Sequence, residues 1–348
     1  MSATTTDAPR DEAALEDRLS RPRAETVAAL RAAPGDLLVL GAGGKMGPSL
    51  ARMAQRAAAD PDAGPARRII AVSRFADASV RGALDAAGVR TIAADLLDRS
   101  ALDALPDAPN VVFMAGQKFG TGGAPSRTWA MNALLPAMVA ERFRRARLVA
   151  FSTGNVYPLT PAGGTGSRED DAPGPVGEYA MSCLARERLL EDAAARRGTR
   201  VAIVRLNYAN DLRYGVLTDI AMQVRDGVPV PLAMGWVNVI WQGDANRIAL
   251  ECLPRAQVPH FVVNVTGAER LEVRALATAL GERLGVPPRF DGEERPDALL
   301  SDTSLLQREF APPEVPVTRM LDWVAAWIIG GGRLLGKPTH FEERGGRF

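Results

Sequence analysis

A glycine-rich turn connects an unbroken apolar run to the start of a helix, and no other feature constrains the fold of this chain as strongly. Leu37–Leu40 is apolar at every position, which is typical of a strand buried on both faces of a sheet. The turn Gly-Ala-Gly-Gly-Lys-Met-Gly follows directly, and a helix is expected over residues 46–59, with Pro48 acceptable in its first turn. Glycines in such a turn allow a tight bend, close approach of a phosphate to the backbone, and close packing of the helix on the strand.

The order of strand, glycine turn and helix predicts a dinucleotide-binding site, because the amide groups at the helix N-terminus then face the phosphates. The alternative is an ordinary connection between a strand and a helix. If the prediction holds, the residues that contact the dinucleotide include those of the turn: Gly41, Gly43, Gly44, Lys45, Met46 and Gly47.

Short apolar runs recur after the glycine turn and alternate with helical segments. They cover residues 69–72, 91–94, 111–114, 148–151 and 201–204. Repeated strand–helix units with apolar strands predict a parallel sheet with helices on both faces. We therefore expect an α/β fold: a Rossmann-type doubly wound parallel sheet with a smaller C-terminal α/β substrate lobe.

The chain divides into four stretches on these patterns. Residues 1–34 form a polar leader that is disordered up to about residue 9 and helical beyond it, with a break near Pro22. Residues 35–207 form the dinucleotide-binding domain. Residues 208–330 form mainly the substrate lobe, with helices at 217–225, 270–284 and 322–329, and with some return to the sheet. Residues 331–348 form a tail, in which Lys-Pro-Thr-His-Phe at 337–341 either folds over the cleft or belongs to a disordered end.

Composition excludes several classes of protein. Hydrophobic residues make up 47% of the 348 residues and the formal net charge is +1, so no global field favours nucleic acid or an anionic membrane. No apolar run approaches the roughly 18 residues of a membrane span. Cys183 and Cys252 cannot form a disulfide framework, which indicates a cytoplasmic protein, and His260 and His340 lack the partners of a metal site.

Several motifs together resemble the extended short-chain dehydrogenase/reductases. Gly41, Gly44 and Gly47 have the Gly-x-x-Gly-x-x-Gly spacing of that superfamily. The run Ser-Thr-Gly-Asn-Val-Tyr at 152–157 is similar to a motif of nucleotide-sugar epimerases and dehydratases, and Asn132 resembles a structural asparagine of the same proteins. The resemblance covers about residues 36–250 and points to the NAD(P)-dependent epimerase/dehydratase family.

The resemblance implies roles for individual residues. Tyr179 would act as acid and base, and Thr153 would polarise the reacting oxygen of a small sugar-like substrate, a sugar or nucleotide-sugar hydroxyl or carbonyl. The family pattern also places dinucleotide contacts outside the turn, at Asp95 and Leu96, at Ala115 and Gly116, and at Tyr179 itself. Dimerisation through two helices of each subunit is common in the family, so a homodimer is implied here.

The end of the second predicted strand bears on the choice of dinucleotide. An acid at this position would hold the ribose 2′-hydroxyl of NAD, whereas an arginine suits the 2′-phosphate of NADP. The chain has Ser73 and Arg74 there and no acid before Asp77. NADP is therefore favoured over NAD, and the alternative is a solvated arginine.

Cys183 stands where the family carries the lysine of Tyr-x-x-x-Lys. A free tyrosine has a pKa of about 10, and the missing lysine would normally lower it. Three replacements are possible: the positive nicotinamide ring, Arg186 on roughly the same helical face as Tyr179, or Lys118 in the turn after the fourth strand. An Ala-Gly-x-Lys turn resembling this one occurs in UDP-galactose 4-epimerases. Arg186 could instead be solvated, and Lys118 could be an ordinary exposed loop lysine.

Two functions follow from this pattern. The first is an NAD(P)-dependent oxidoreductase, epimerase or dehydratase that works through Tyr179 and Thr153, with Lys118 or Arg186 supplying charge. The second is a non-catalytic NAD(P)-binding sensor or scaffold that has lost the active-site lysine. Two later positions have further expected roles: Arg205 resembles part of an Arg-x-x-Asn substrate segment, and Asp244 is expected to cap a helix.

Overall fold

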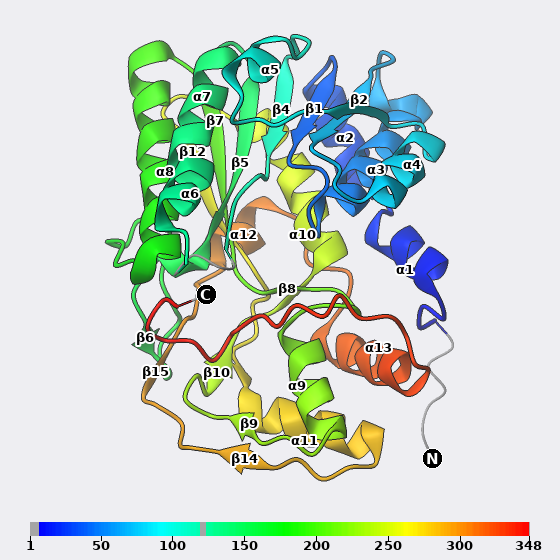
Figure 1. Ribbon diagram of the computed structural model, residues 1–348, viewed down its shortest axis with the longest axis vertical. Coiled ribbons are helices and arrows are strands. Elements are labelled where there is room, and N and C mark those ends of the chain that lie inside the picture. Colours follow the sequence, from blue (N-terminus) through cyan, green and yellow to red (C-terminus); the bar gives the residue numbers. More distant parts are fainter. Residues whose placement is uncertain (1–6, 119–122, 348) are drawn as a thin grey trace.

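A parallel sheet forms the upper half of the molecule in Figure 1. The computed structural model describes residues 7–118 and 123–347, and within them seven strands form this sheet in the order β12-β7-β5-β4-β1-β2-β3. Neighbouring strands all run parallel, as predicted, so the Rossmann-type α/β fold is confirmed. The strands are β1 Leu37–Leu40, β2 Ile69–Ser73, β3 Arg90–Ala93, β4 Asn110–Phe113, β5 Arg147–Thr153, β7 Arg200–Leu206 and β12 Phe261–Val265.

β1 lies between β2 and β4, so the chain order reverses at this point of the sheet. After β3 the chain returns past β1 and enters β4 on its other side. In open α/β sheets, ligands bind outside the carboxyl ends of the strands at such a switch point. The turns after β1 and β4, which contain most of the predicted site residues, therefore meet at the expected edge.

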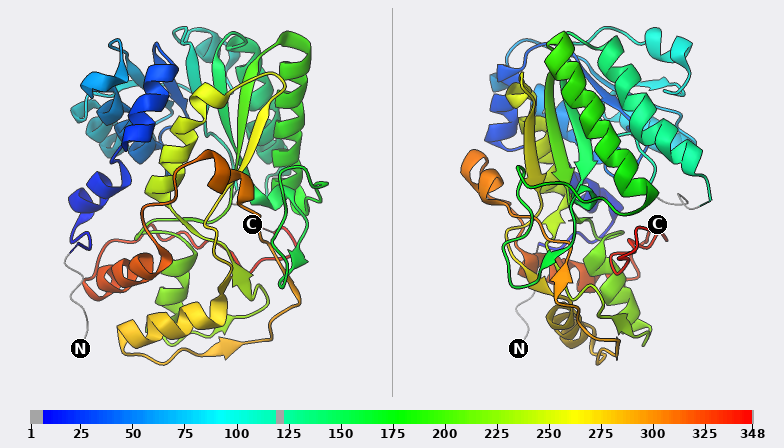
Figure 2. Two further views of the ribbon diagram at one scale, coloured as in Figure 1. Left: turned by 180° about the vertical axis from the view of Figure 1, so that it is seen from behind. Right: turned by 90° about the vertical axis from the view of Figure 1, so that its left-hand side faces the viewer.

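Side chains of β1 alternate between two hydrophobic cores. Leu37 and Val39 pack with helices on one face, and Leu38 and Leu40 pack with helices on the other. Figure 2 shows the sheet between these two helical layers. The first layer contains α2 Ala24–Ala32, α3 Gly47–Ala58 and α10 Gln242–Glu251, and the second contains α7 Leu135–Arg142 and α8 Gly177–Arg197.

The other elements of the upper half are short. They are α4 Ala78–Ala86, α5 Arg99–Asp103, α6 Pro125–Trp129, α12 Ser304–Glu309, a π-helix at Ala130–Leu134, and 3₁₀ turns at Pro61–Ala63, Gly154–Val156 and Leu253–Arg255.

The lower half of Figure 1 is the smaller lobe, built on three helices around a core of its own. These are α9 Val216–Arg225, α11 Val273–Leu284 and α13 Val317–Ile329. The predicted helix at 270–284 starts later than expected, because Leu271–Glu272 forms strand β13 against β10. The remaining short strands, some at the border of the two halves, are β6 Thr160–Pro161, β8 Ala209–Asn210, β9 Val230–Pro231, β10 Trp236–Val237, β11 Ile240–Trp241, β14 Phe290–Asp291 and β15 Asp297–Ala298.

The segment before residue 35 is part of both cores. It contains α1 Glu12–Leu19 and α2, separated around Pro22 as predicted. Leu15 and Leu19 are buried in the core of the lower lobe, whereas Leu30 is buried beside the sheet. The prediction of a polar leader over residues 1–34 was therefore incomplete, because its helices bury apolar side chains. Of the stretch expected to be disordered, residues 1–6 lie outside the described residues, and Asp7 accepts a hydrogen bond from Trp323 Nε1 at 3.2 Å.

The tail after α13 crosses between the sheet and the lower lobe (Figure 1, red). Phe341 is only 1% exposed and belongs to the core of the lower lobe. Of the two alternatives for residues 337–341, the folded one is therefore correct. Among the described residues, no helix is long and apolar enough to cross a membrane.

Candidate functional site

The glycine turn brings the ends of β1 and β4 into contact. Gly41 has φ +92°, and a Cβ there would lie 2.5 Å from the backbone nitrogen of Ala115. A Cβ on Gly47, the first residue of α3, would lie 2.5 Å from the carbonyl oxygen of Ala42. Only glycine fits either position, so the tight bend and the close packing predicted from the sequence are both present.

The opposite side of the turn is open. Gly43 and Gly44 are exposed, and a Cβ on Gly44 would meet only the carbonyl oxygen of Gly41, at 3.4 Å. No side chain caps the N-terminus of α3, whose N-cap is Met46. Backbone amides and the positive end of the helix dipole thus lie beside the exposed Gly43 and Gly44, which fits the pyrophosphate of a dinucleotide.

The end of β2 borders the same turn, and the end of β3 lies next to the end of β2. A Cβ on Gly43 would lie 2.6 Å from Ser73 Oγ, so the predicted Ser73 does adjoin the turn. Arg74 is exposed next to it. After β3, Asp95 is exposed and its carboxylate accepts a hydrogen bond from the backbone nitrogen of Leu97 at 3.1 Å, while Leu96 is buried.

Asn132 holds the turn that follows β4. Its Oδ1 accepts from the backbone nitrogen of Gln117 at 2.8 Å, and its Nδ2 donates to the Gln117 carbonyl at 2.9 Å. Asn132 lies on the π-helix, and Nδ2 also donates to Ser182 Oγ on α8 at 3.0 Å. The predicted structural role of Asn132 is therefore clear: it fixes the turn containing Ala115 and Gly116 against α8.

Tyr179 and Thr153 meet at the carboxyl edge of the sheet. Thr153 is the last residue of β5 and Tyr179 lies in the first turn of α8, and the Thr153 hydroxyl is near enough to the phenol to affect its pKa. Burial raises the pKa of the Tyr179 hydroxyl above its usual range, whereas the Thr153 hydroxyl and the charge of Arg186 act in the opposite direction. The phenol is therefore held in its neutral, proton-bearing form.

Cys183 provides no charge at the position of the expected lysine. It is 1% exposed and packs against Val156 and Tyr157. Burial raises the pKa of its thiol, so the thiol stays neutral. Cys183 is thus a small buried side chain on the tyrosine helix.

Arg186 is buried rather than solvated, so one of the two alternatives for it was wrong. Its guanidinium donates to the Asn132 carbonyl at 3.1 Å, to the Ala115 carbonyl at 3.4 Å and to the Phe151 carbonyl. These bonds tie α8 to the ends of β4 and β5 and leave a fixed positive charge near Tyr179.

Lys118 reaches the tyrosine from the turn after β4. Its Nζ lies 5.9 Å from the centre of the Tyr179 ring and donates to the carbonyl oxygen of Thr339 at 3.3 Å. The side chain is partly buried, and burial lowers its pKa to about 8. The alternative of an ordinary exposed loop lysine was therefore wrong, because the tail covers it.

Of the three lysines of the chain, Lys118 and Lys337 both lie near enough to Lys45 to affect its pKa. Lys45 Nζ lies 3.2 Å from the centre of the Tyr214 ring. Burial, and then the charges of Lys118 and Lys337, lower the pKa of Lys45 to about 7. Although arginine supplies nearly all of the positive charge in the chain, the lysines gather where the turns after β1 and β4 meet the tail.

Three residues near this cluster were not predicted: Tyr214, Asp219 and Thr339. They lie in or beside α9 and in the tail, and their closeness to Lys45 and Lys118 depends on contacts distant in sequence. The sequence allowed the segment at 337–341 to fold over the cleft, but no local pattern indicated a role for Asp219.

Two other predicted positions have structural roles. Arg205 donates to the buried Glu187 carboxylate at 2.7 Å and to the Tyr157 hydroxyl at 2.6 Å, so its guanidinium is held within the fold. Asp244 does not cap a helix, because α10 begins earlier, at Gln242. Its carboxylate instead accepts from the backbone nitrogen of Glu314 at 2.9 Å and holds the loop before α13.

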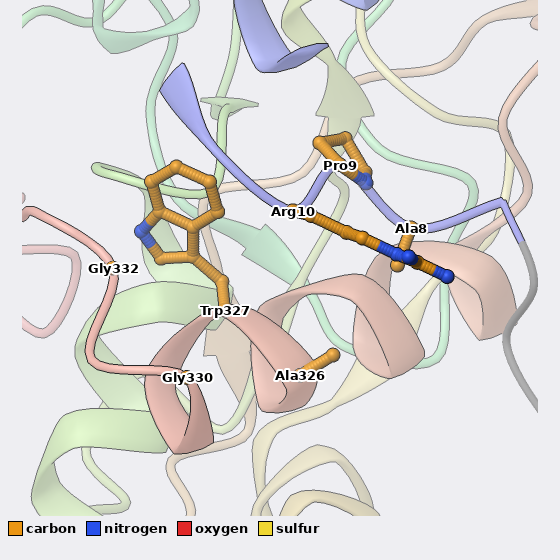
Figure 3. A pocket seen from close by; sticks show the side chains of 7 residues that line it. All are labelled: Ala8, Pro9, Arg10, Ala326, Trp327, Gly330 and Gly332. Carbon is orange, nitrogen blue, oxygen red and sulfur yellow. The ribbon is translucent and has the colours of Figure 1, made fainter. Parts of the chain in front are cut away.

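A surface pocket lies apart from all of these residues. Figure 3 shows it between the N-terminal segment and α13, with Arg10 and Trp327 on its walls. None of the residues lining it belongs to the predicted site. In the described part of the chain, no three His, Cys, Asp or Glu side chains gather in a way that could hold a metal ion.

Comparisons with known proteins show the family and the fold. A model of the NAD dependent epimerase/dehydratase family matches residues 37–230. No curated protein matches the chain. Among solved structures, a UDP-glucose 4-epimerase of Thermotoga maritima with UDP-glucose is 16% identical, with a TM-score of 0.69 over 85% of this chain and 99% of that one.

Two further epimerase structures are similar. The UDP-glucuronic acid 4-epimerase of Bacillus cereus in complex with NAD is 16% identical, with a TM-score of 0.67 over 84% of this chain and 98% of that one. The UDP-glucose 4-epimerase of Thermus thermophilus in complex with NAD is 20% identical, with a TM-score of 0.66 over 83% and 97%. At these identities the likeness concerns the fold.

Proposed function

Because the chain belongs to the NAD dependent epimerase/dehydratase family, we propose that it is an NAD(P)-dependent enzyme acting on a hydroxyl or carbonyl of a sugar or nucleotide sugar. One observation carries this proposal: Thr153 at the end of β5 and Tyr179 in the first turn of α8 lie together at the carboxyl edge of the sheet, with Lys118 close to the tyrosine ring. The UDP-glucose bound to the Thermotoga maritima epimerase supports the class of substrate.

The dinucleotide would be held by the open side of the glycine turn, with Gly44 and the N-terminus of α3 at the pyrophosphate. Ala115 and Gly116 would lie beneath the nicotinamide ribose, and Asp95 and Leu96 would meet the adenine. When bound, the nicotinamide supplies hydride acceptance and donation, which is the cofactor's own chemistry. Exposed Arg74 at the end of β2 favours NADP, although the similar Bacillus cereus and Thermus thermophilus enzymes were solved with NAD.

The protein's own groups would handle the proton. Thr153 would donate a hydrogen bond to the reacting oxygen of the substrate, and Tyr179 would give a proton to that oxygen or take one from it. Cys183 supplies no charge, so the phenolate that forms when Tyr179 gives up its proton would need another cation. The Lys118 ammonium would stabilise the Tyr179 phenolate, and the fixed charge of Arg186 would add to this effect.

A Tyr179→Phe variant tests the proposal. Turnover on a panel of sugars and nucleotide sugars should fall by roughly a hundredfold or more, because positioned acid–base catalysis contributes about 10²–10⁴-fold. Binding of NADPH or NADH, followed by fluorescence, should barely change, because the phenyl ring keeps its place on α8. The proposal of an enzyme would be refuted if the wild type binds a dinucleotide but turns over nothing on the panel, and if that binding requires Tyr179.

The second candidate is a non-catalytic NAD(P)-binding sensor or scaffold, and the neutral Cys183 in place of lysine favours it. The two candidates differ in turnover, not in dinucleotide binding. Cys183→Lys separates them further: a detuned enzyme gains turnover, whereas a sensor gains none.

The division of labour between the two parts of the chain is also a proposal. Residues 35–207 would bind the dinucleotide and residues 208–330 would bind the substrate, with β12 and α10 of the second stretch returning to the sheet. Cys183 and Cys252 are both free and buried, which supports placement in the reducing cytoplasm.

A homodimer would form through α7 and α8. Leu134 is 55% exposed at the end of the π-helix, directly before α7, and Met181 and Leu189 on α8 are 44% and 38% exposed. These helices pack side by side and face the viewer in the right-hand view of Figure 2. Exposed large apolar side chains on neighbouring helices favour association with a second copy.

A further inference from the structure

The C-terminal tail contacts both halves of the molecule around the proposed catalytic cation. On the side of the sheet, the Thr339 carbonyl accepts from Lys118 Nζ, and Gly346 packs closely on Gly177 at the start of α8. On the side of the lower lobe, the Phe341 carbonyl accepts from the Tyr208 hydroxyl at 3.3 Å. The tail is therefore held from both sides.

Asp219 clamps the tail at the residue that meets Lys118. Its Oδ2 accepts from the backbone nitrogen of Thr339 at 2.7 Å and from Thr339 Oγ1 at 2.6 Å. Asp219 lies in the first turn of α9, so a regular helix of the lower lobe fixes its position. Two bonds to one residue fix the orientation of that peptide, and the next bond in the chain of contacts is the one to the Lys118 ammonium.

We propose that Asp219 and Thr339 are positioning residues for Lys118, with Asp219 holding Thr339 so that the Thr339 carbonyl keeps the ammonium beside Tyr179. The idea rests on the proposed function, in which Lys118 supplies the charge that Cys183 lacks. In this proposal the tail completes the active site. The Asp219 carboxylate of the lower lobe holds the Thr339 peptide of the tail, and that peptide holds Lys118 in the turn after β4.

Electrostatics supports the arrangement. The charged and titratable groups that act on Lys118 are Lys45 from the glycine turn, Cys183 from α8, Asp219 from α9 and Glu342 from the tail. Burial lowers the pKa of Lys118, while the negative charges of Asp219 and Glu342 raise it. Asp219 thus helps to keep the ammonium charged as well as in place.

The small number of lysines makes a direct test possible. Full-length protein grown with lysine carbon-13 labelled at Cε should give three lysine signals, which Lys→Arg variants at positions 45, 118 and 337 assign. Their titration with pH is then followed by NMR in wild type and in Asp219→Asn. Asparagine keeps an oxygen that accepts from Thr339 but removes the charge.

In Asp219→Asn, the titration midpoint of Lys118 should move down by about one pH unit, as expected for loss of a nearby opposite charge. The Lys45 midpoint should move in the same direction, because Asp219 also acts on Lys45. Asp226→Asn is the matched control: Asp226 follows α9, pairs with Arg225, and should leave both midpoints unchanged. An unchanged Lys118 midpoint in Asp219→Asn would overturn the proposal, and this readout needs no turnover, so it stands apart from any failure of the proposed function.

Thr339 provides a second test through turnover. Thr339→Val removes the hydroxyl bond to Asp219 and should lower kcat by about tenfold to a hundredfold, because a shift of about 1 Å in a catalytic group has effects of that size. Thr339→Ser keeps the hydroxyl and should restore kcat. Equal activity of the valine and serine variants, in an enzyme that turns over, would contradict a positioning role.

Discussion

At the scale of single residues, Cys183 gives Tyr179 no positive charge, and we propose that Lys118 supplies one from elsewhere in the fold. A lysine at this position would come from the same helix as Tyr179. Lys118 comes instead from the turn after β4, and its ammonium lies 5.9 Å from the centre of the tyrosine ring. The proposed chemistry needs a cation near the phenol of Tyr179. The turn after β4, α8 and the tail all lie close to that phenol.

The pH dependence of turnover tests the role of Lys118. Its pKa is lowered to about 8, so the ammonium is charged below that pH and neutral above it. Activity that needs the charge should therefore fall as the pH rises through about 8. Lys118→Met should lose roughly a hundredfold in kcat at pH 7, the usual cost of removing one stabilising donor.

Lys118→Arg is the control, because a guanidinium remains charged throughout this range. It should retain part of the activity and lose the decline above pH 8. A decline of the same shape in Lys118→Arg would assign the titration to another group.

Residues whose role depends on local backbone could be predicted, and residues whose role depends on distant contacts could not. The glycine turn could be predicted from the spacing of its glycines directly after an apolar strand. The structure has no room for a side chain at Gly41 or Gly47. Asp219 and Thr339 are separated by 120 positions, and nothing in either local sequence indicates that they meet.

At the scale of elements, α8 carries Tyr179, and a buried ion pair anchors it to the sheet. Glu187 on α8 binds Arg205 on β7 at 2.7 Å, with side-chain exposures of 0% and 5%. Glu187→Gln would leave the guanidinium buried without a full counter-charge, so the free energy of unfolding should fall by about 3 kcal/mol.

Urea denaturation measures this effect, and Asp192→Asn on the same helix is the comparison. Asp192 pairs with Arg196 at the surface, where such a pair contributes less than about 1 kcal/mol. Equal losses in the two variants would show that the buried pair does not anchor α8.

Sequence patterns located most strands of the sheet well because they contain short apolar runs between polar turns, although β3, Arg90–Ala93, is largely exposed. They placed the start of α11 too early, since residues 270–272 look helical in isolation and only the pairing of β13 with β10 makes them extended. The start of α13 was placed too late, at residue 322 rather than at Val317.

At the scale of the whole molecule, the leader and the tail connect the two halves. Leu15 is buried in the lower core and Leu30 beside the sheet, while the tail contacts Lys118 on one side and Asp219 on the other. The roles of these terminal segments were hard to predict, because the residues that bury their apolar side chains are distant in sequence.

Association is a further property at this scale. The wild type should have the mass of a dimer in light scattering after size-exclusion chromatography. Met181→Glu combined with Leu189→Glu should give a monomer, because two charges would be buried in the apolar contact. Ile329→Glu is the control: Ile329 is 67% exposed at the end of α13, away from α7 and α8. A monomeric wild type would refute the proposed interface.

The most direct test of the whole account is a fluorescence titration with NADPH and NADH. Wild type should bind at least one of them, and Gly44→Val should abolish binding while keeping the fold, because a side chain there enters the open side of the turn and meets only the Gly41 carbonyl. Gly82→Ala, in open space on α4, should bind as wild type does. If wild type binds neither dinucleotide, or if folded Gly44→Val binds as well as wild type, the glycine turn is not a cofactor site and the proposed chemistry at Tyr179 is wrong.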